Sequence, residues 1–221
     1  MIKSVIWSSM LDYPDNICTT IFFDTCNFDC EYCYNKEIKD KESIDFYEQV
    51  LPKLNKRKVF IKNIILSGGE CTLDKISQQV LDCLFDNGFT IGIHTNGSNI
   101  DFIKRNIDKI SFIGMDIKTS FEKYNQITRV EVNTQIIKQS IKYIIDSKVD
   151  YEFRTTIYPK YVEEKDCINI AKYLKSEDAK LYVLQQYKDM EDLKVTPYNE
   201  ELLLNIVNKC NEYLNTKLRG I

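Results

Sequence analysis

Short runs of apolar and β-branched residues recur along the chain, and turn residues bound each run. This pattern is typical of buried parallel strands, which do not alternate polar and apolar positions as half-exposed strands do. It predicts strands at residues 18–23, 59–67, 89–95, 110–118, 149–158 and 179–187.

Segments with apolar residues at three- and four-residue steps follow these runs and predict amphipathic helices. Pro52 is expected to kink or end the first helix near its C-terminal part, and Gly88 is expected to end the second. The helices are predicted at 43–54, 73–88, 133–147, 163–176 and about 199–217.

Strand and helix thus alternate about six times, which favours a parallel sheet with right-handed crossovers. Six units are too few for a closed eight-stranded barrel, so we expect an α/β fold of the open, partial (β/α)6 TIM-like barrel kind. A single domain over residues 1–221 is predicted. In such folds function gathers at the C-terminal ends of the strands.

Composition and charge narrow the function classes. The net charge is −3 and neither sign forms a long block, which disfavours nucleic acid as the main partner. No run of about 18 uncharged apolar residues and no signal peptide is visible, so we expect a cytoplasmic protein without a membrane partner. His94 is the only histidine, which excludes His-rich zinc sites.

Three of the eight cysteines, Cys26, Cys30 and Cys33, lie in the segment 24–35, directly after the first predicted strand. Their spacing also suits a helix with a cysteine stripe, or a zinc site that recruits Cys71 as a fourth ligand. Polar residues between the thiols favour a loop. Three thiolates on one loop suit a [4Fe–4S] cluster in which the fourth iron keeps an open position.

The CxxxCxxC segment, followed one strand later by Gly68-Gly69-Glu70, resembles the radical S-adenosylmethionine (SAM) superfamily. The resemblance implies that SAM chelates the open iron through its amino and carboxylate groups. An electron from the cluster then cleaves the sulfonium and gives methionine and a 5′-deoxyadenosyl radical. The protein would position the reactants and exclude water.

The same resemblance assigns roles to further residues. Tyr32 is expected to lie against the adenine, and the segment from Ser67 to Glu70 to hold the SAM amino group. His94 either lines the cofactor pocket or is a strand-end histidine hydrogen-bonded to a backbone carbonyl. The remaining expected cofactor contacts are Thr95, Asn96, Asp116, Lys118, Arg154 and Gln185, with Lys118 and Arg154 facing the SAM carboxylate and ribose.

A narrower resemblance runs from about Leu11 to Tyr187 and includes the segment MDIKTSFEKYNQIT. It is similar to the activating proteins of anaerobic (class III) ribonucleoside-triphosphate reductase and related glycyl-radical enzymes. This implies a glycyl-radical enzyme as protein substrate and a flavodoxin- or ferredoxin-like electron donor. Tyr34 and His94 favour the alternative of a small-molecule, peptide or nucleoside-precursor substrate, and a zinc-binding interaction module with Cys71 is the third hypothesis.

Overall fold

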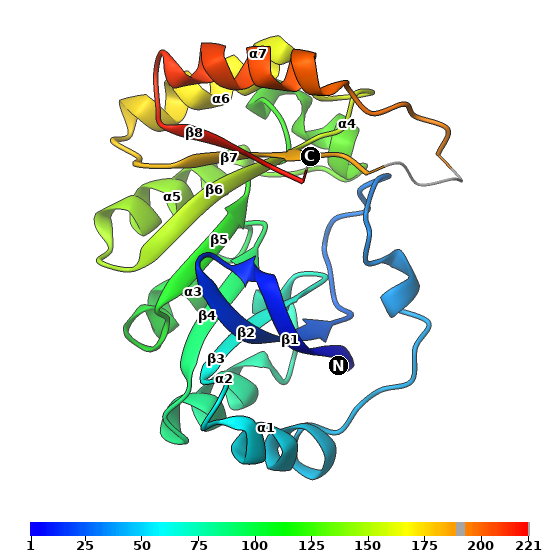
Figure 1. Cartoon of the computed structure of the whole chain (residues 1–221), viewed down its shortest axis with the longest axis vertical. Coiled ribbons are helices and arrows are strands. Elements are labelled where there is room, and N and C mark those ends of the chain that lie inside the picture. The colour runs from blue at the N-terminus through cyan, green and yellow to red at the C-terminus, as the bar shows by residue number, and fades with distance from the viewer. Residues whose placement is uncertain (189–192, 221) are drawn as a thin grey trace. The chain divides into compact units, whose positions relative to one another are not determined.

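The computed structural model describes residues 1–188 and 193–220 (Figure 1). The chain divides into two compact units, each built from several segments. Unit 1 consists of Met1–Asn27, Tyr34–Thr95 and Asn99–Gly114, and unit 2 of Phe28–Cys33, Asn96–Ser98 and Met115–Ile221. The single-domain organisation stays a prediction.

Unit 1 contains a mostly parallel sheet. β2 and β3 pair in parallel with Phe23 opposite Gly68, so both strands end at the same level. β3 and β4 are also parallel, whereas β1 pairs with β2 in the antiparallel direction and contains irregular register shifts. The strands are β1 (Ile2–Tyr13), β2 (Asn16–Phe23), β3 (Asn63–Gly68), β4 (Thr90–Thr95) and the first part of β5 (Phe112–Asp116).

The helices of unit 1 are α1 (Leu51–Arg57), α2 (Ser77–Asp86) and α3 (Ile100–Asn106). Gly88 follows α2 with a φ of 68°, which glycine adopts without strain, and the predicted helix stop is confirmed. The helix does not end at Pro52, since α1 continues to Arg57. The regular helix is instead distorted just before Pro52, where a π-helical turn at Phe46–Val50 precedes α1.

Unit 2 continues the alternation of strand and helix. Its parallel strands β6 (Asp150–Ile157), β7 (Tyr182–Gln186) and β8 (Thr216–Arg219) are neighbours in that order. Three isoleucines of one helix, α5, are fully buried at helical spacing, namely Ile137, Ile141 and Ile144. The helices are α4 (Tyr124–Thr128), α5 (Thr134–Asp146), α6 (Glu164–Ser176) and α7 (Glu200–Asn211).

The structure differs from the predicted elements mainly at the edges. β1 and β8 were not predicted, and the last helix ends at Asn211 rather than near 217 because Thr216–Arg219 form a strand. β3 begins at Asn63 rather than 59, since Val59 and Phe60 are 88% and 83% exposed and belong to the preceding turn. The apolar run alone did not reveal that its first residues face solvent.

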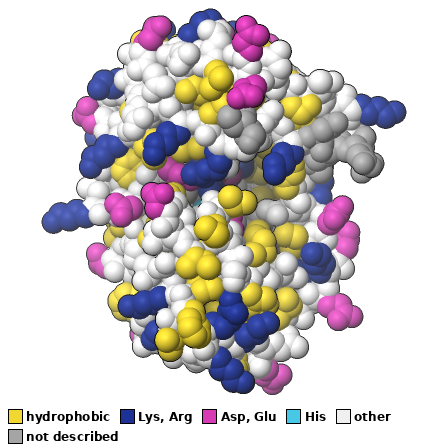
Figure 2. All heavy atoms as spheres, in the orientation of Figure 1, with side chains coloured by type: hydrophobic (Ala, Val, Ile, Leu, Met, Phe, Trp, Pro, Cys, Tyr) yellow, Lys and Arg dark blue, Asp and Glu magenta, His cyan; other side chains and the backbone are white. Residues whose placement is uncertain are grey.

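Unit 1 also exposes apolar side chains on β1, including Met10 and Leu11. On the face drawn in Figure 2, hydrophobic side chains are interspersed with lysines and arginines in the lower part of the view. Among the described residues, none of the helices has the length and apolar character needed to cross a membrane.

Candidate active site

In unit 1 the Gly-Gly-Glu segment packs against the start of the cysteine segment. The backbone N–H of Gly69 donates to the carbonyl of Phe23 at 2.7 Å, and that of Glu70 donates to the carbonyl of Thr25 at 2.5 Å. A Cβ on Gly69 would lie 2.3 Å from the Thr25 carbonyl oxygen. Glycine is therefore required at position 69, because two backbones meet here and leave no room for a Cβ.

Two further contacts fix the same region. Asn35, at the end of the cysteine segment, donates its side-chain amide to the Gly68 carbonyl at 2.7 Å. Thr25 donates its hydroxyl to the carboxylate of Asp74 at 2.8 Å. Both ends of the segment 24–35 are thus hydrogen-bonded to the end of β3 or to the chain that follows it.

Glu70 is fully buried, and one carboxylate oxygen accepts hydrogen bonds from two threonine hydroxyls. The distances to Oε1 are 2.5 Å from Thr72 Oγ1 and 2.7 Å from Thr95 Oγ1. The hydroxyls orient the carboxylate within unit 1. The contact of Glu70 with an amino group stays a prediction.

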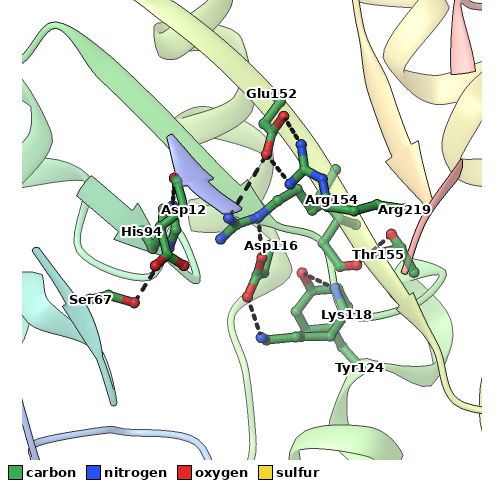
Figure 3. Close-up of polar contacts among 11 residues, drawn as sticks. Asp12, Ser67, His94, Asp116, Lys118, Tyr124, Glu152, Arg154, Thr155 and Arg219 are labelled. Carbon is green, nitrogen blue, oxygen red and sulfur yellow. Dashed lines mark hydrogen bonds and ion pairs between the residues drawn. The ribbon is translucent and has the colours of Figure 1, made fainter. Parts of the chain in front are cut away.

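Both ring nitrogens of His94 have protein partners. Nε2 lies 2.8 Å from the carbonyl oxygen of Asp12, and Nδ1 lies 3.4 Å from the hydroxyl of Ser67 (Figure 3). Since a carbonyl only accepts, Nε2 carries the proton and Nδ1 accepts from Ser67. This is the geometry of a strand-end histidine that links the end of β4 to the end of β1.

Cys71 lies beside the same strand end. Its thiol donates to the backbone carbonyl of His94 at 3.4 Å, and burial raises the pKa of the thiol well above its usual value. A buried thiol of this kind packs as a small apolar side chain with a weak S–H donor. The role of a space-filling side chain is favoured.

In unit 2, Cys30 and Tyr32 lie close to the side chains that follow β5. Lys118 is near both residues, and Lys118 Nζ donates to Asp116 Oδ2 at 2.9 Å (Figure 3). Burial acts to lower the pKa of Lys118, but the charge of Asp116 and its hydrogen bond to Lys118 outweigh it and raise the pKa well above its usual value. Lys118 is therefore a fixed cation beside the cysteine segment.

Tyr32 is buried, and its ring packs against Tyr158 with 5.1 Å between ring centroids. Within the described part of the chain, its hydroxyl has no hydrogen-bond partner. Burial raises its pKa, so the hydroxyl stays protonated. A buried donor without a protein acceptor leaves a polar contact open for a bound group.

Asp116 also orders Arg154. Its Oδ1 accepts from Arg154 Nε at 2.8 Å, so one carboxylate lies between the lysine and the arginine (Figure 3). Arg154 is itself buried and lies 3.9 Å from Glu152. Three of the predicted cofactor contacts, Asp116, Lys118 and Arg154, are thus brought together. The carboxylates of Asp116 and Glu152 balance the charges of the lysine and the arginine.

Sequence analysis missed the outer partner of this network. Arg219 on β8 makes a bidentate pair with Glu152, at 2.7 Å and 2.8 Å. Glu152 is only 2% exposed, so its charge depends on these arginines. No local spacing links positions 152 and 219, and the strand that carries Arg219 was not predicted.

Sequence analysis also missed Glu31, which stands between Cys30 and Tyr32. Lys160 donates to both carboxylate oxygens at 2.8 Å, and Arg129 lies 3.1 Å from Oε2. The hydrogen bonds from Lys160 hold the pKa of Glu31 below its usual value, although burial opposes the shift. An acidic residue beside a cysteine ligand was the available signal, but its partners are far away in sequence.

The remaining predicted residues are distributed over both units. Cys26 belongs to unit 1, whereas Cys30 and Cys33 belong to unit 2, where the N–H of Cys33 donates to the Cys30 carbonyl at 3.2 Å. Asn96 is buried and accepts from the N–H of Ser98 at 2.9 Å, and Gln185 is half-buried on β7. Their contacts with a cofactor stay predictions.

The donor chemistry fits an iron–sulfur cluster. All eight cysteines are thiols rather than disulfides, and three of them lie within eight residues of one segment. Residues 1–188 and 193–220 contain no preformed group of three His, Cys, Asp or Glu side chains arranged around a metal ion. Cys26, Cys30 and Cys33 stay the predicted ligands of the cluster, and the cofactor contacts of Tyr32, Lys118 and Arg154 stay predictions.

Comparison with known proteins identifies a family. The model of the Radical SAM superfamily matches residues 20–174. A Methanocaldococcus jannaschii protein with the name "Putative glycyl-radical enzyme activating enzyme" is 31% identical over 236 residues, which cover 100% of this chain and 96% of that protein.

Two solved structures show the same fold. Streptococcus suis SuiB bound to S-adenosylmethionine has a TM-score of 0.67 at 14% identity and covers 88% of this chain and 48% of that chain. A radical SAM methyltransferase from Sphaerobacter thermophilus has a TM-score of 0.70 at 12% identity, over 94% of this chain and 67% of that chain. The predicted fold class, an α/β partial barrel with mostly parallel strands, is confirmed.

The family match covers more than half of the chain, and the full-length relative agrees with it. This chain is an enzyme that belongs to the radical SAM superfamily, whose members use a [4Fe–4S] cluster and S-adenosylmethionine.

Proposed function

We propose that this enzyme generates a glycyl radical on a partner protein, and that the partner is an anaerobic ribonucleoside-triphosphate reductase. The observation that carries the proposal is the 31% identity to a protein named as a glycyl-radical enzyme activating enzyme, which extends over 100% of this chain. The likeness of MDIKTSFEKYNQIT and its neighbours to reductase activating proteins supports the choice of partner.

The cluster, when bound, supplies one electron to the sulfonium of SAM, which gives methionine and a 5′-deoxyadenosyl radical for abstraction of a glycine hydrogen. The side chains of the protein would orient SAM and neutralise the charge of its carboxylate. Lys118 and Arg154 would pair with the SAM carboxylate and ribose region, and Asp116 holds both cations at 2.8–2.9 Å. Tyr32 would lie against the adenine, as the family resemblance implies.

Anaerobic reconstitution with iron and sulfide, followed by reductant, SAM and the reductase, tests the proposal. We expect 5′-deoxyadenosine together with a glycyl radical in the EPR spectrum of the reductase. Cys30→Ala should abolish both products, whereas Cys83→Ala, which removes a thiol from α2, should retain them.

Two outcomes would favour the other hypotheses. Formation of 5′-deoxyadenosine without a glycyl radical would overturn the activating role and favour a small-molecule or peptide substrate, for which Tyr34 is the local signal. One bound zinc ion without sulfide would favour the zinc module. That zinc site would need Cys71 as its fourth ligand.

A further inference from the structure

Glu31 is the most densely paired carboxylate near the cysteine segment. It is 8% exposed, and Lys160 Nζ lies 2.8 Å from each of its oxygens. Arg129 Nη2 lies 3.1 Å from Oε2, and the hydroxyls of Tyr158 and Tyr161 each donate at 3.3 Å. Charge-assisted bonds of this kind are among the stronger polar contacts in proteins.

These partners come from two different loops of unit 2. Arg129 follows α4, and Lys160 and Tyr161 follow β6. A backbone hydrogen bond joins the cysteine segment to the same region as Arg129: the N–H of Asp29 donates to the Thr128 carbonyl at 2.9 Å. The segment Phe28–Cys33 is therefore anchored to both loops through a residue adjacent to Cys30.

The backbone of Arg129 ends α4. Arg129 adopts a φ of 57°, in the left-handed region that is common at helix C-termini, and its N–H donates to the Asn125 carbonyl at 3.0 Å. The side chain that pairs with Glu31 therefore starts from a fixed helix end.

Glu31 lies among positive charges. Among the described interactions, its carboxylate faces the two cations Lys160 and Arg129 beside Cys30. The reduction potential of an iron–sulfur cluster depends on net charge and hydrogen bonding around it. Glu31 and its partners are thus suited to hold the cysteine segment and also to set the reduction potential of the cluster.

We propose that Glu31 is a positioning residue: through Lys160, Arg129 and the two tyrosines it holds Cys30 and Cys33 in place for the cluster and sets the charge beside it. The proposal rests on the cluster being held by these cysteines. It does not depend on which substrate the enzyme acts on.

The test uses the whole chain, reconstituted anaerobically with iron and sulfide, and needs no partner protein. Glu31→Gln removes a negative charge and should raise the midpoint potential of the bound cluster, whereas Lys160→Met removes a positive charge and should lower it. Both variants should also lose iron several-fold faster to a chelator than the wild-type chain. Glu122→Gln and Lys175→Met, exposed residues of unit 2, are the matched controls and should change neither quantity.

A merely structural role would accelerate iron loss in both variants without shifting the potential in opposite directions. Shifts of equal sign, or iron retention in Glu31→Gln equal to that of Glu122→Gln, would overturn the proposal. If Glu31→Gln retains no cluster, the test uses the midpoint potentials of the cluster in Lys160→Met and in Glu31→Asp. Glu31→Asp keeps the negative charge on a shorter side chain. Absence of a glycyl radical on the reductase would contradict the proposed function and leave these readouts intact.

Discussion

At His94 each ring nitrogen has a protein partner within unit 1, as expected for a strand-end histidine, and its contact with a cofactor stays a prediction. The bond from Nε2 to the Asp12 carbonyl, at 2.8 Å, joins two strand ends that are distant in sequence. Sequence analysis could name both roles for a lone strand-end histidine. It could not choose between them, because the choice depends on β1, a strand that the hydrophobic pattern did not reveal.

His94→Ala should lower the free energy of unfolding of the apo chain by about 1 kcal/mol, the usual value of one hydrogen bond. His94→Gln keeps a donor near the position of Nε2 and should recover most of the loss. Urea unfolding followed by circular dichroism measures both values. A tenfold loss of SAM cleavage at unchanged stability would instead place the ring in the cofactor pocket.

Gly69 is a predicted cofactor contact that also lies where two backbones meet in the structure. Gly69→Ala would place a Cβ 2.3 Å from the Thr25 carbonyl oxygen, next to Cys26. The backbone must shift, at a cost of about 1–3 kcal/mol typical of overpacking, and the cysteine segment shifts with it. We expect reduced iron content after anaerobic reconstitution.

Gly88→Ala is the matched control for Gly69→Ala. It strains a φ of 68° after α2 but meets only the flexible end of Lys58, at 3.3 Å. It should cost about 1 kcal/mol of stability and leave iron binding unchanged. Equal iron loading in the two variants would show that the Gly-Gly-Glu segment does not order the cysteines.

At the scale of elements, the capping box of α6 fixes a helix start in unit 2. Asp166 is buried and accepts from the N–H of Glu163 at 2.9 Å, from Lys123 at 2.8 Å and from Ser120 at 2.7 Å. Burial alone would raise the pKa of Asp166, but these hydrogen bonds lower it below its usual value. The folded state is therefore favoured by the ionised carboxylate.

Asp166→Asn should lower the free energy of unfolding by about 3 kcal/mol at pH 7, from the lost cap and the lost charged hydrogen bonds. A lowered pKa contributes stability above the pKa of the unfolded chain, and this contribution is lost as the pH falls through the folded pKa. The difference between variant and wild type should thus shrink below about pH 4. Urea unfolding at several pH values measures it.

The control for Asp166 is Asp146, which pairs with Lys142 at 3.1 Å on an exposed face of α5. Asp146→Asn should change stability by no more than about 0.5 kcal/mol at any pH, since exposed pairs contribute little. A difference for Asp166→Asn that stays constant from pH 7 to below pH 4 would contradict the assigned role of the charge.

Helices of this chain were predictable where one face is apolar throughout, as in α5, with its buried Ile137, Ile141 and Ile144. Strands were predictable where both faces are buried, as in β3. β1 and β8 carry mixed polar and apolar residues and few buried positions, so their sequences resemble loops. Their pairing with β2 and β7 forms these strands, and such tertiary pairing leaves no local signal.

At the scale of the whole molecule, the candidate site depends on pairs between distant parts of the chain. Sequence motifs identified Cys26, Cys30 and Cys33 and the Asp116-x-Lys118 segment, because a family resemblance carries local patterns. They did not identify Glu31 with Lys160, or Glu152 with Arg219, since each pair forms only after folding. Asp116, which pairs with Lys118 and Arg154, was predicted, whereas these two further pairs were not.

The pair of Glu152 and Arg219 links the last strand to Arg154, and Arg219→Ala tests that link. The variant leaves Glu152 buried with Arg154 as its nearest cation at 3.9 Å, so Arg154 should turn from Asp116 toward Glu152. We expect a loss of about 2 kcal/mol in stability, less than for a fully buried pair because Arg219 is partly exposed. SAM should bind several-fold more weakly, measured by equilibrium dialysis under anaerobic conditions.

Lys217→Ala, on the exposed side of the same strand, should change neither stability nor SAM binding. The double variant Arg219→Ala with Glu152→Gln should be more stable than Arg219→Ala alone, because it removes the carboxylate that would otherwise remain buried with too little positive charge. If the double variant is less stable than Arg219→Ala by the full effect of Glu152→Gln, the two residues act independently. In that case β8 supports unit 2 by its backbone pairing with β7 and not through the charges behind Arg154.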